Sequence, residues 1–288
     1  MSIATENTAR LIAEPAEDYH RRSEHSKGML YDFHERPRIF EGRYITKTIP
    51  LKETTAGMGI GTLVHAALLE PHKLHELYAV VPEELLASNG ALSTKAAKDF
   101  VATARGRGQI PLKADQFQVV AAMAQSVNAA CGSWLGKAAL IEQTITWTHP
   151  ATGLACRCKP DWIRPTKNGT SIAFDLKTTA DISAHGFRGS VENFGYWLQD
   201  AHYSEGIEAA TGKPVDAFYF VAVESEAPYA CRVFQLDSES RAAAKEARED
   251  LLANLAECYR TGEFRDSFEG VVTPISVRPF AYQSGENQ

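Results

Sequence analysis

The sequence predicts a mixed α/β fold, in which a central mixed β-sheet is flanked by helices and preceded by an N-terminal helical layer. Before residue 135, the chain contains several segments with helical spacing of apolar residues and helix start and stop signals. From residue 141 the pattern changes to short β-rich segments. A helix, a second hairpin and a long amphipathic helix follow, which favours helices packed on a sheet.

The first helix is predicted within "HSKGMLYDFHERP". Ser26 is a suitable N-cap, and Met29, Leu30 and Phe33 are spaced as on one face of a helix. Pro37 should end or kink this helix, because proline lacks the amide proton that the helix needs.

The second helix is predicted within "TTAGMGIGTLVHAALLEP". Thr54 or Thr55 provides a start signal and Pro71 a stop signal. The apolar run 60–69 is too long for a typical strand. Its early glycines predict that another element packs closely on the first turns.

Further helices are predicted at 93–105 and 113–131, where good helix formers are frequent. Residues 141–149 alternate in the manner of a strand, and residues 150–153 form a turn. The segments "LACRCKPDWI" and "TSIAFDLKT" are predicted to be the next two strands.

A helix is expected over 191–210. The segments "DAFYFVAVE" and "YACRVFQLD" predict a hairpin that turns at Ala227 and Pro228. The final helix has Ser238 near its N-cap and Gly262 at its end.

The chain has 288 residues and is 44% hydrophobic, which is sufficient for one large domain with a substantial core. We expect a flexible N-terminus over 1–17, a single domain over 18–270 and a tail over 271–288. The domain divides into a mainly helical part (18–135) and a core of sheet and helices (140–265).

Composition excludes several classes of protein. No apolar run approaches the roughly 18 residues that cross a bilayer, and the first residues do not have the pattern of a secretory signal. The number of cysteines is odd and they are scattered, which predicts reduced thiols and a cytoplasmic location without membrane contact. They are Cys131, Cys156, Cys158, Cys231 and Cys258.

The net charge of −6 argues against non-specific coating of nucleic acid, but the charges are distributed unevenly. One basic cluster lies between residues 95 and 113, whereas acids predominate between 224 and 269. This asymmetry is typical of a protein that presents one face to a polyanion, although a solvated helix would also explain the cluster. The basic residues considered for DNA contact are Lys95, Lys98, Arg105 and Arg107.

The main candidate catalytic residues, Asp161, Asp175 and Lys177, lie in the segment 159–179. If Lys167, Asn168 and Gly169 form a three-residue loop, Asp161 lies directly opposite Asp175 on the neighbouring strand. Lys177 then shares the face of Asp175, because side chains alternate along a strand. A two-residue Asn-Gly turn would instead place Asp161 on the other face, so the prediction requires the longer loop or a bulge near Pro165.

Two carboxylates on a semi-buried face repel each other, and a divalent cation resolves this. Oxygen ligands favour Mg²⁺, with Mn²⁺ as a substitute. Lys177 beside a metal-bound water would suit phosphodiester hydrolysis. The alternative is a salt bridge between Asp175 and Lys177, with Asp161 protecting a strand edge.

The pattern Pro160-Asp161 followed by Asp175-Leu176-Lys177 resembles the PD-(D/E)XK nuclease signature. The segments "GIGTLVHAALLEP", "YHRRSEHSKGMLYDFHERP" and "YWLQDAHYSEGIEAATG" resemble helices of RecE (exonuclease VIII)-like nucleases and their phage-encoded relatives. The resemblance extends from about residue 18 to residue 265. It implies a restriction-endonuclease-like core and a Mg²⁺-dependent 5′→3′ exodeoxyribonuclease that leaves 3′ overhangs for recombination.

The resemblance also implies roles for individual residues. Asp161, Asp175, the Leu176 carbonyl and His65 would form the metal site, with Lys177 as the catalytic lysine. The remaining catalytic candidates are Gln199 and Tyr203, which share one face of a helix, and Glu142, whose role is less defined.

Arg157 and Lys159 would contact the scissile strand or screen the acids, provided that their strand is regular. Cys156 and Cys158 have no suitably spaced partners for a zinc or iron–sulfur site, which argues against relatives with a four-cysteine cluster.

Implied partners are ends of double-stranded DNA and a RecT-like single-strand annealing protein. Because the chain is acidic overall, the resemblance further implies a homo-oligomeric ring that confines positive potential to its channel. The alternatives are a RecB-like or repair nuclease of other polarity or endonucleolytic action, a non-catalytic DNA-binding module, and an acidic structural protein.

Overall fold

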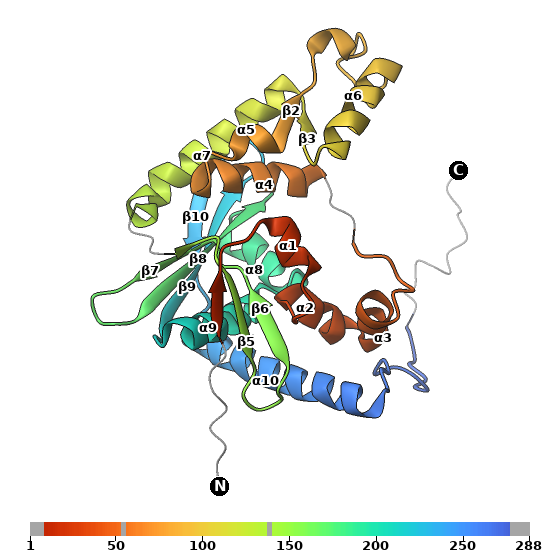
Figure 1. Cartoon of the computed structure of the whole chain (residues 1–288), viewed down its shortest axis with the longest axis vertical. Coiled ribbons are helices and arrows are strands. Elements are labelled where there is room, and N and C mark those ends of the chain that lie inside the picture. The colour runs from red at the N-terminus through yellow and green to blue at the C-terminus, as the bar shows by residue number, and fades with distance from the viewer. Residues whose placement is uncertain (1–8, 53–55, 137–139, 277–288) are drawn as a thin grey trace, which may run out of the picture.

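The computed structural model of the chain describes residues 9–52, 56–136 and 140–276. Figure 1 shows a body built on β-sheets, with a long helical lobe extending from one side of it. The helices are α1 (Ala16–Arg21), α2 (Lys27–Glu35), α3 (Pro37–Phe40), α4 (Ala56–Leu69), α5 (Leu74–Leu77), α6 (Lys95–Gly106), α7 (Ala114–Leu135), α8 (Ala184–Asn193), α9 (Tyr196–Thr211) and α10 (Ser238–Thr261), with a π-helical turn, η1 (Glu41–Ile45), and a 3-10 turn, η2 (Glu83–Leu85).

Three sheets are present in the described part of the chain. A five-stranded sheet has the order β10-β9-β8-β7-β4, a three-stranded sheet has the order β1-β5-β6, and β2 pairs with β3. The strands are β1 (Arg10–Ile12), β2 (Tyr78–Val80), β3 (Ile110–Leu112), β4 (Leu140–Ile141), β5 (Thr144–Thr148), β6 (Ala155–Cys158), β7 (Trp162–Pro165), β8 (Ser171–Thr179), β9 (Val215–Glu224) and β10 (Cys231–Phe234).

The five-stranded sheet is mixed, because β8 and β9 are parallel whereas the other pairs are antiparallel. One face packs with residues of α4 and α7 in a core that includes Phe174. The other face packs with residues of α2, α8, α9 and α10 in a core that includes Ala173 and Phe220. This arrangement confirms the predicted α/β class with a central mixed sheet between helical layers.

Two predicted strands are each divided in the structure. The segment 141–149 forms β4 and then β5, and "LACRCKPDWI" forms β6 and then β7, so in each case the chain passes from one sheet to the other. Glu142, at the first division, has a φ of 53°, a left-handed conformation that an extended strand excludes. Its amide donates to the carbonyl of Asp161, at 3.0 Å, which joins the two crossing points.

Most predicted helices are confirmed. The Ser26 side chain accepts a hydrogen bond from the Met29 amide at the start of α2, and Pro37 begins the short α3. The segments 93–105 and 113–131 correspond to α6 and α7. Thr54 and Thr55, the predicted start of the second helix, lie outside the described residues.

The single helix predicted over 191–210 is wrong. Two helices, α8 and α9, meet at Gly195, which has a φ of 61°. A Cβ atom at this position would lie 2.3 Å from Cδ2 of Tyr31 in α2, so the turn also needs glycine for space. The start of α8 was not predicted, although the Ser183 side chain caps it by accepting a hydrogen bond from the Gly186 amide.

The termini differ in part from expectation. Residues 10–12, within the N-terminal segment that was predicted to be flexible, pair with β5. Residues 271–276 have no regular secondary structure. Among the described residues, no helix combines the length and the apolar character needed to cross a bilayer.

Candidate metal centre and active site

The hairpin between β7 and β8 has the predicted three-residue loop. Pro165 pairs with Ser171 and Trp162 with Phe174, so extending the register by one residue places Asp161 opposite Asp175. The loop contains Gly169 with a φ of 81°, as the prediction requires.

Strand β8, the second strand of the hairpin, carries Asp175 and Lys177, which form a hydrogen-bonded group with Gln199. The Lys177 ammonium lies 2.5 Å from Oδ2 of Asp175 and donates to Oε1 of Gln199 at 2.9 Å. The amide of Gln199 in turn donates to Oδ1 of Asp175. Gln199 reaches the group from α9, which packs on this face of the sheet, so the predicted proximity of these three residues is present in the fold.

The first half of the hairpin faces α4. Nε2 of His65 lies 2.9 Å from Oδ1 of Asp161 and 3.0 Å from Oε1 of Glu142. Lys159 lies 2.9 Å from Oε2 of Glu142. The backbone amide of Leu176 donates to Oδ2 of Asp161 at 2.6 Å, which connects this group to the strand that carries Asp175 and Lys177.

These side chains suit a divalent cation. Ligand atoms of His65, Glu142 and Asp161 all lie within 4.8 Å of one another. Oε1 of Glu142 and Oδ2 of Asp175 are buried and accept no hydrogen bond of normal geometry, although each lies near a nitrogen. An ionised carboxylate is costly to bury without full compensation, so a divalent cation beside either group would offset this cost.

The Leu176 carbonyl has a suitable orientation for the same site. In an extended strand, the amide and the carbonyl of one residue point to the same edge. Because the Leu176 amide points to Asp161, its carbonyl oxygen also faces the edge where the carboxylates lie. The residues that would hold the cation are therefore Asp161, Asp175 and the Leu176 carbonyl, with His65 or Glu142.

The protonation of these groups depends on burial and on their neighbours. Burial and the Asp161 carboxylate raise the pKa of Asp175 to about 6. Burial disfavours the His65 cation, but Asp161 and Glu142 overcome this and raise the His65 pKa well above its usual value. Burial likewise opposes ionisation of Asp161, yet His65 and the Leu176 amide hold its pKa below the usual value.

We expect Mg²⁺ to raise the melting temperature more at pH 8 than at pH 6. A metal ligand must be deprotonated, and at pH 6 the cation has to displace protons from Asp175 and His65. Without metal, both groups contribute stability that is lost as the pH rises, because their folded pKa values lie above the unfolded ones. Asp161, whose pKa is lowered, loses its contribution only in more acidic solution.

Thermal scans at several Mg²⁺ concentrations and both pH values measure this difference. A Mg²⁺-induced shift that is the same at pH 6 and pH 8 would contradict the assignment of Asp175 and His65 to the metal site.

Tyr203 packs near the group formed by Asp175, Lys177 and Gln199 but makes no described hydrogen bond to it. Its ring packs edge-on against Phe218, and burial raises the pKa of its hydroxyl, with further contributions from Tyr19 and Asp175. In the described structure, no hydrogen bond joins it to Asp161, Asp175 or Lys177. The geometry therefore supports a packing position beside the site.

The structure does not bring Arg157 to the carboxylates. Arg157 is buried, its guanidinium donates to the carbonyls of Arg22 and Glu24, and it lies 5.0 Å from the ring centre of Tyr19. The condition of a regular strand fails, because β6 ends at Cys158 and belongs to another sheet than β7. Lys159 does reach the site, where its Glu142 contact favours screening of an acid.

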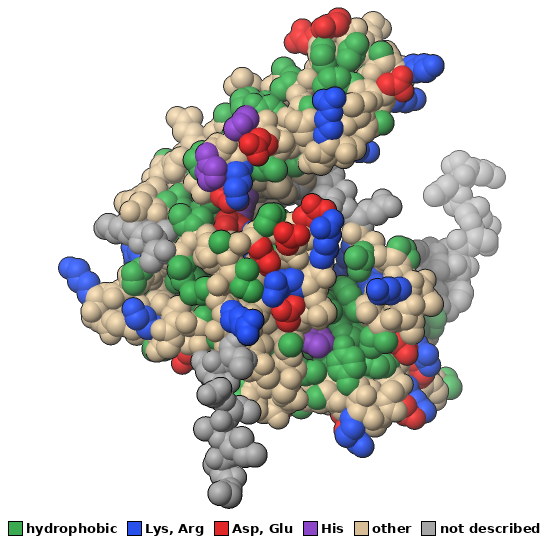
Figure 2. Space-filling model, in the orientation of Figure 1, with side chains coloured by type: hydrophobic (Ala, Val, Ile, Leu, Met, Phe, Trp, Pro, Cys, Tyr) green, Lys and Arg blue, Asp and Glu red, His purple; other side chains and the backbone are tan. Residues whose placement is uncertain are grey.

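The basic cluster of α6 lies apart from the carboxylates. Its side chains are exposed, and α6 itself lies in the outer part of the lobe (Figure 1). Figure 2 shows acidic and basic side chains gathered around a hollow between this lobe and the body of the protein. The cluster is therefore not part of the carboxylate groups described above. The cluster consists of Lys95, Lys98, Arg105 and Arg107.

Two residues near Lys177 were not predicted. The Lys177 ammonium lies 4.4 Å from the ring centre of Tyr196. The ammonium of Lys27 lies 5.5 Å from the same ring centre, and burial together with Lys177 lowers the Lys27 pKa to about 7. Lys27 belongs to α2, so sequence spacing alone could not bring it to this place.

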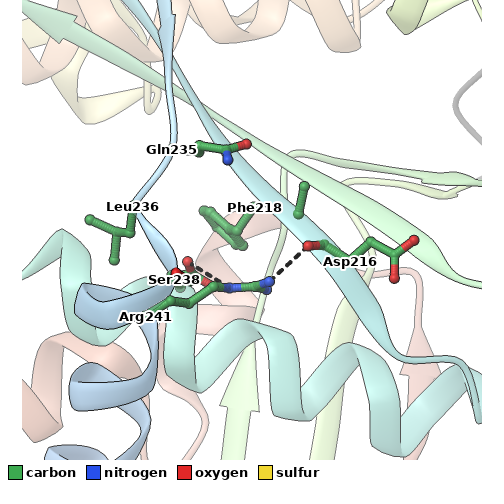
Figure 3. A pocket seen from close by; sticks show the side chains of 8 residues that line it. Asp216, Phe218, Gln235, Leu236, Ser238 and Arg241 are labelled. Carbon is green, nitrogen blue, oxygen red and sulfur yellow. Dashed lines mark hydrogen bonds and ion pairs between the residues drawn. The ribbon is translucent and has the colours of Figure 1, made fainter.

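Two other features do not form a second reactive site. His149, Glu205 and Glu249 come together, but both carboxylates already pair with the buried guanidinium of Arg248. A cavity of about 170 Å³ lies where α10 approaches β9. Figure 3 shows Arg241 bridging this region, where it donates to the Asp216 carbonyl at 2.9 Å.

Comparison with known proteins agrees with this geometry. Residues 41–270 match the family described as a PDDEXK-like domain of unknown function (DUF3799). A solved structure from Eubacterium rectale, provisionally named an exonuclease, is similar with a TM-score of 0.56 and 15% identity, covering 95% of this chain and 99% of that one. A second structure, SSO0001, has a TM-score of 0.29 and 11% identity over 78% of this chain and 85% of its own, too low to indicate a shared fold.

No curated protein matches the sequence. The family match nevertheless spans most of the chain and includes every residue of the carboxylate and lysine groups described above. The chain therefore belongs to the PDDEXK-like DUF3799 family, within the PD-(D/E)XK nuclease superfamily, and has its restriction-endonuclease-like fold.

Proposed function

We propose that this protein is a Mg²⁺-dependent exodeoxyribonuclease of the RecE type, which degrades the 5′-ended strand of linear duplex DNA and leaves 3′ overhangs for recombination. The observation that carries the proposal is the register of the β7–β8 hairpin, which places Asp161 opposite Asp175, with Asp161 bonded to the Leu176 amide and Lys177 paired with Asp175. Membership of the PDDEXK-like family and the similarity to a provisionally named exonuclease support the same class of chemistry.

Different residues of the site have different roles in the proposed phosphodiester hydrolysis. A divalent cation held by Asp161, Asp175 and the Leu176 carbonyl would polarise the phosphate and lower the pKa of a water molecule. Lys177 is held by Gln199, so its ammonium is directed to the same edge as the carboxylates, where it orients the attacking water or stabilises the negative charge that develops on the phosphate. Lys159 offsets the charge of Glu142 and keeps the site from becoming too negative for DNA.

The polarity of digestion is testable with linear duplex DNA labelled separately at its 5′ and 3′ ends. We expect early release of the 5′ label in Mg²⁺, with Mn²⁺ as a weaker or equal substitute, and none in EDTA. Earlier release of the 3′ label would refute the proposed polarity. Cleavage of a covalently closed circle would instead indicate an endonuclease.

The proposal extends to partners. Ends of duplex DNA are the substrate, and a RecT-like annealing protein would receive the 3′ overhang. Because the net charge is −6, a homo-oligomeric ring would allow basic residues to face a central channel while the outer surface remains acidic. Sedimentation of the full chain with and without DNA ends measures the assembly.

A further inference from the structure

Tyr196 is the aromatic residue against which the Lys177 ammonium rests. The distance of 4.4 Å between Nζ and the ring centre lies well within the range of a cation–π contact. Tyr196 is the first residue of α9, one turn before Gln199, so a single helix start supplies two partners of the lysine. The sequence motif accounts for Gln199 but not for Tyr196.

The ring is fixed from several directions. It stacks on Phe220, the residue of β9 that pairs with Asp175, with ring centres 5.7 Å apart. The turn before it is held by α2, because the Tyr31 hydroxyl donates to the Asn193 carbonyl at 2.9 Å and Lys27 donates to the Phe194 carbonyl. A residue held in this way can define the position of a flexible lysine side chain.

We propose that Tyr196 is a positioning residue for Lys177, acting through the face of its ring; this inference depends on the proposed nuclease function. Among the residues that the structure describes, Lys177 contacts Asp175, Gln199 and Tyr196. If Asp175 binds a cation, its ion pair with Lys177 is weakened. The position of the ammonium then depends mainly on Gln199 and Tyr196. An aromatic face holds an ammonium without accepting its proton, so it fixes the position of the amine and leaves its charge intact.

The experiment varies the ring without changing its size. Tyr196→Phe is compared with variants that carry mono-, di- and trifluorinated phenylalanine at position 196, because fluorine progressively weakens the attraction of the ring face for a cation. We expect Tyr196→Phe to stay within about two-fold of the wild-type kcat. The trifluorinated variant should lose about ten-fold in kcat with little change in KM, as expected for a desolvated cation–π contact.

The same series at Tyr219 provides a matched control. Tyr219 lies on β9, where its ring stacks on Trp134 and makes a tilted contact with Phe174 on the opposite face of the sheet. Fluorination there should leave kcat unchanged. Equal kcat across the series at position 196, or equal losses at positions 196 and 219, would overturn the positioning role.

An NMR measurement separates this inference from the nuclease proposal. The resonances of the Lys177 side chain should be shifted upfield by the ring current of Tyr196, and the shift should persist in Tyr196→Phe and disappear in Tyr196→Leu. Absence of the ring-current shift in the wild-type protein would overturn the inference even if the protein digests DNA. Its presence in a protein without nuclease activity would refute the proposed function alone.

Discussion

Replacement of Lys177 by alanine is expected to lower kcat for linear duplex DNA by about 10³-fold, because positioned charge and proton transfer each contribute on this scale. The Lys177 ammonium is partly buried and contacts Asp175, Gln199 and Tyr196, and alanine can make none of these contacts. The measurement is the initial rate of nucleotide release from a labelled duplex at saturating Mg²⁺.

The same variant should bind metal at least as well as the wild type. Lys177 competes with a cation for Oδ2 of Asp175, so its removal should increase the Mg²⁺-induced rise in melting temperature. Lys167→Ala is the matched control, because Lys167 is exposed in the loop of the same hairpin and should leave the rate unchanged. A Lys177→Ala protein that digests DNA at the wild-type rate would show that the chemistry lies elsewhere.

The carboxylate hairpin could be predicted because its geometry depends on local information. Loop length fixes strand register, and Gly169 supplies the positive φ of a three-residue loop, so the positions of Asp161, Asp175 and Lys177 follow from about twenty residues of sequence. Positions on the helices, such as His65 and Gln199, came from the family resemblance, and both lie at the site.

Features that depend on distant parts of the chain could not be predicted in the same way. An apolar segment carries no mark of the point where it leaves one sheet for another, so the divisions near Glu142 and Asp161 were missed. Arg157 and Lys159 have similar surroundings in the sequence, yet the first is buried against carbonyls of the α1–α2 connection and the second reaches Glu142. Lys27 reaches Tyr196 only through the packing of α2 on α9.

The substitution Asp175→Asn should have opposite effects on function and on stability. Loss of a carboxylate ligand is expected to abolish both nuclease activity and the Mg²⁺-induced thermal shift. In metal-free solution at pH 8, however, the variant should be more stable than the wild type. The pKa of Asp175 is raised to about 6 by burial and by Asp161, so ionisation of this group opposes folding.

The raised pKa of Asp175 gives the sign of this effect. Ionisation of the folded-state carboxyl costs stability above about pH 6, and asparagine cannot ionise. The penalty decreases as the pH falls through about 6 and vanishes near the unfolded pKa of about 4, because Asp175 is then protonated in both states. The two proteins should therefore differ at pH 8 and converge in acid.

Denaturant unfolding of both proteins in EDTA, at pH 5 and pH 8, measures this difference, with Asp250→Asn on the exposed face of α10 as the control. Saturating Mg²⁺ should reverse the order at pH 8, since only the wild type gains stability from the cation. If the variant is less stable than the wild type in EDTA at pH 8, Asp175 stabilises the metal-free fold through its ion pair with Lys177. The buried acid would then be explained as part of a salt bridge, and the main reason for placing a cation beside it would be lost.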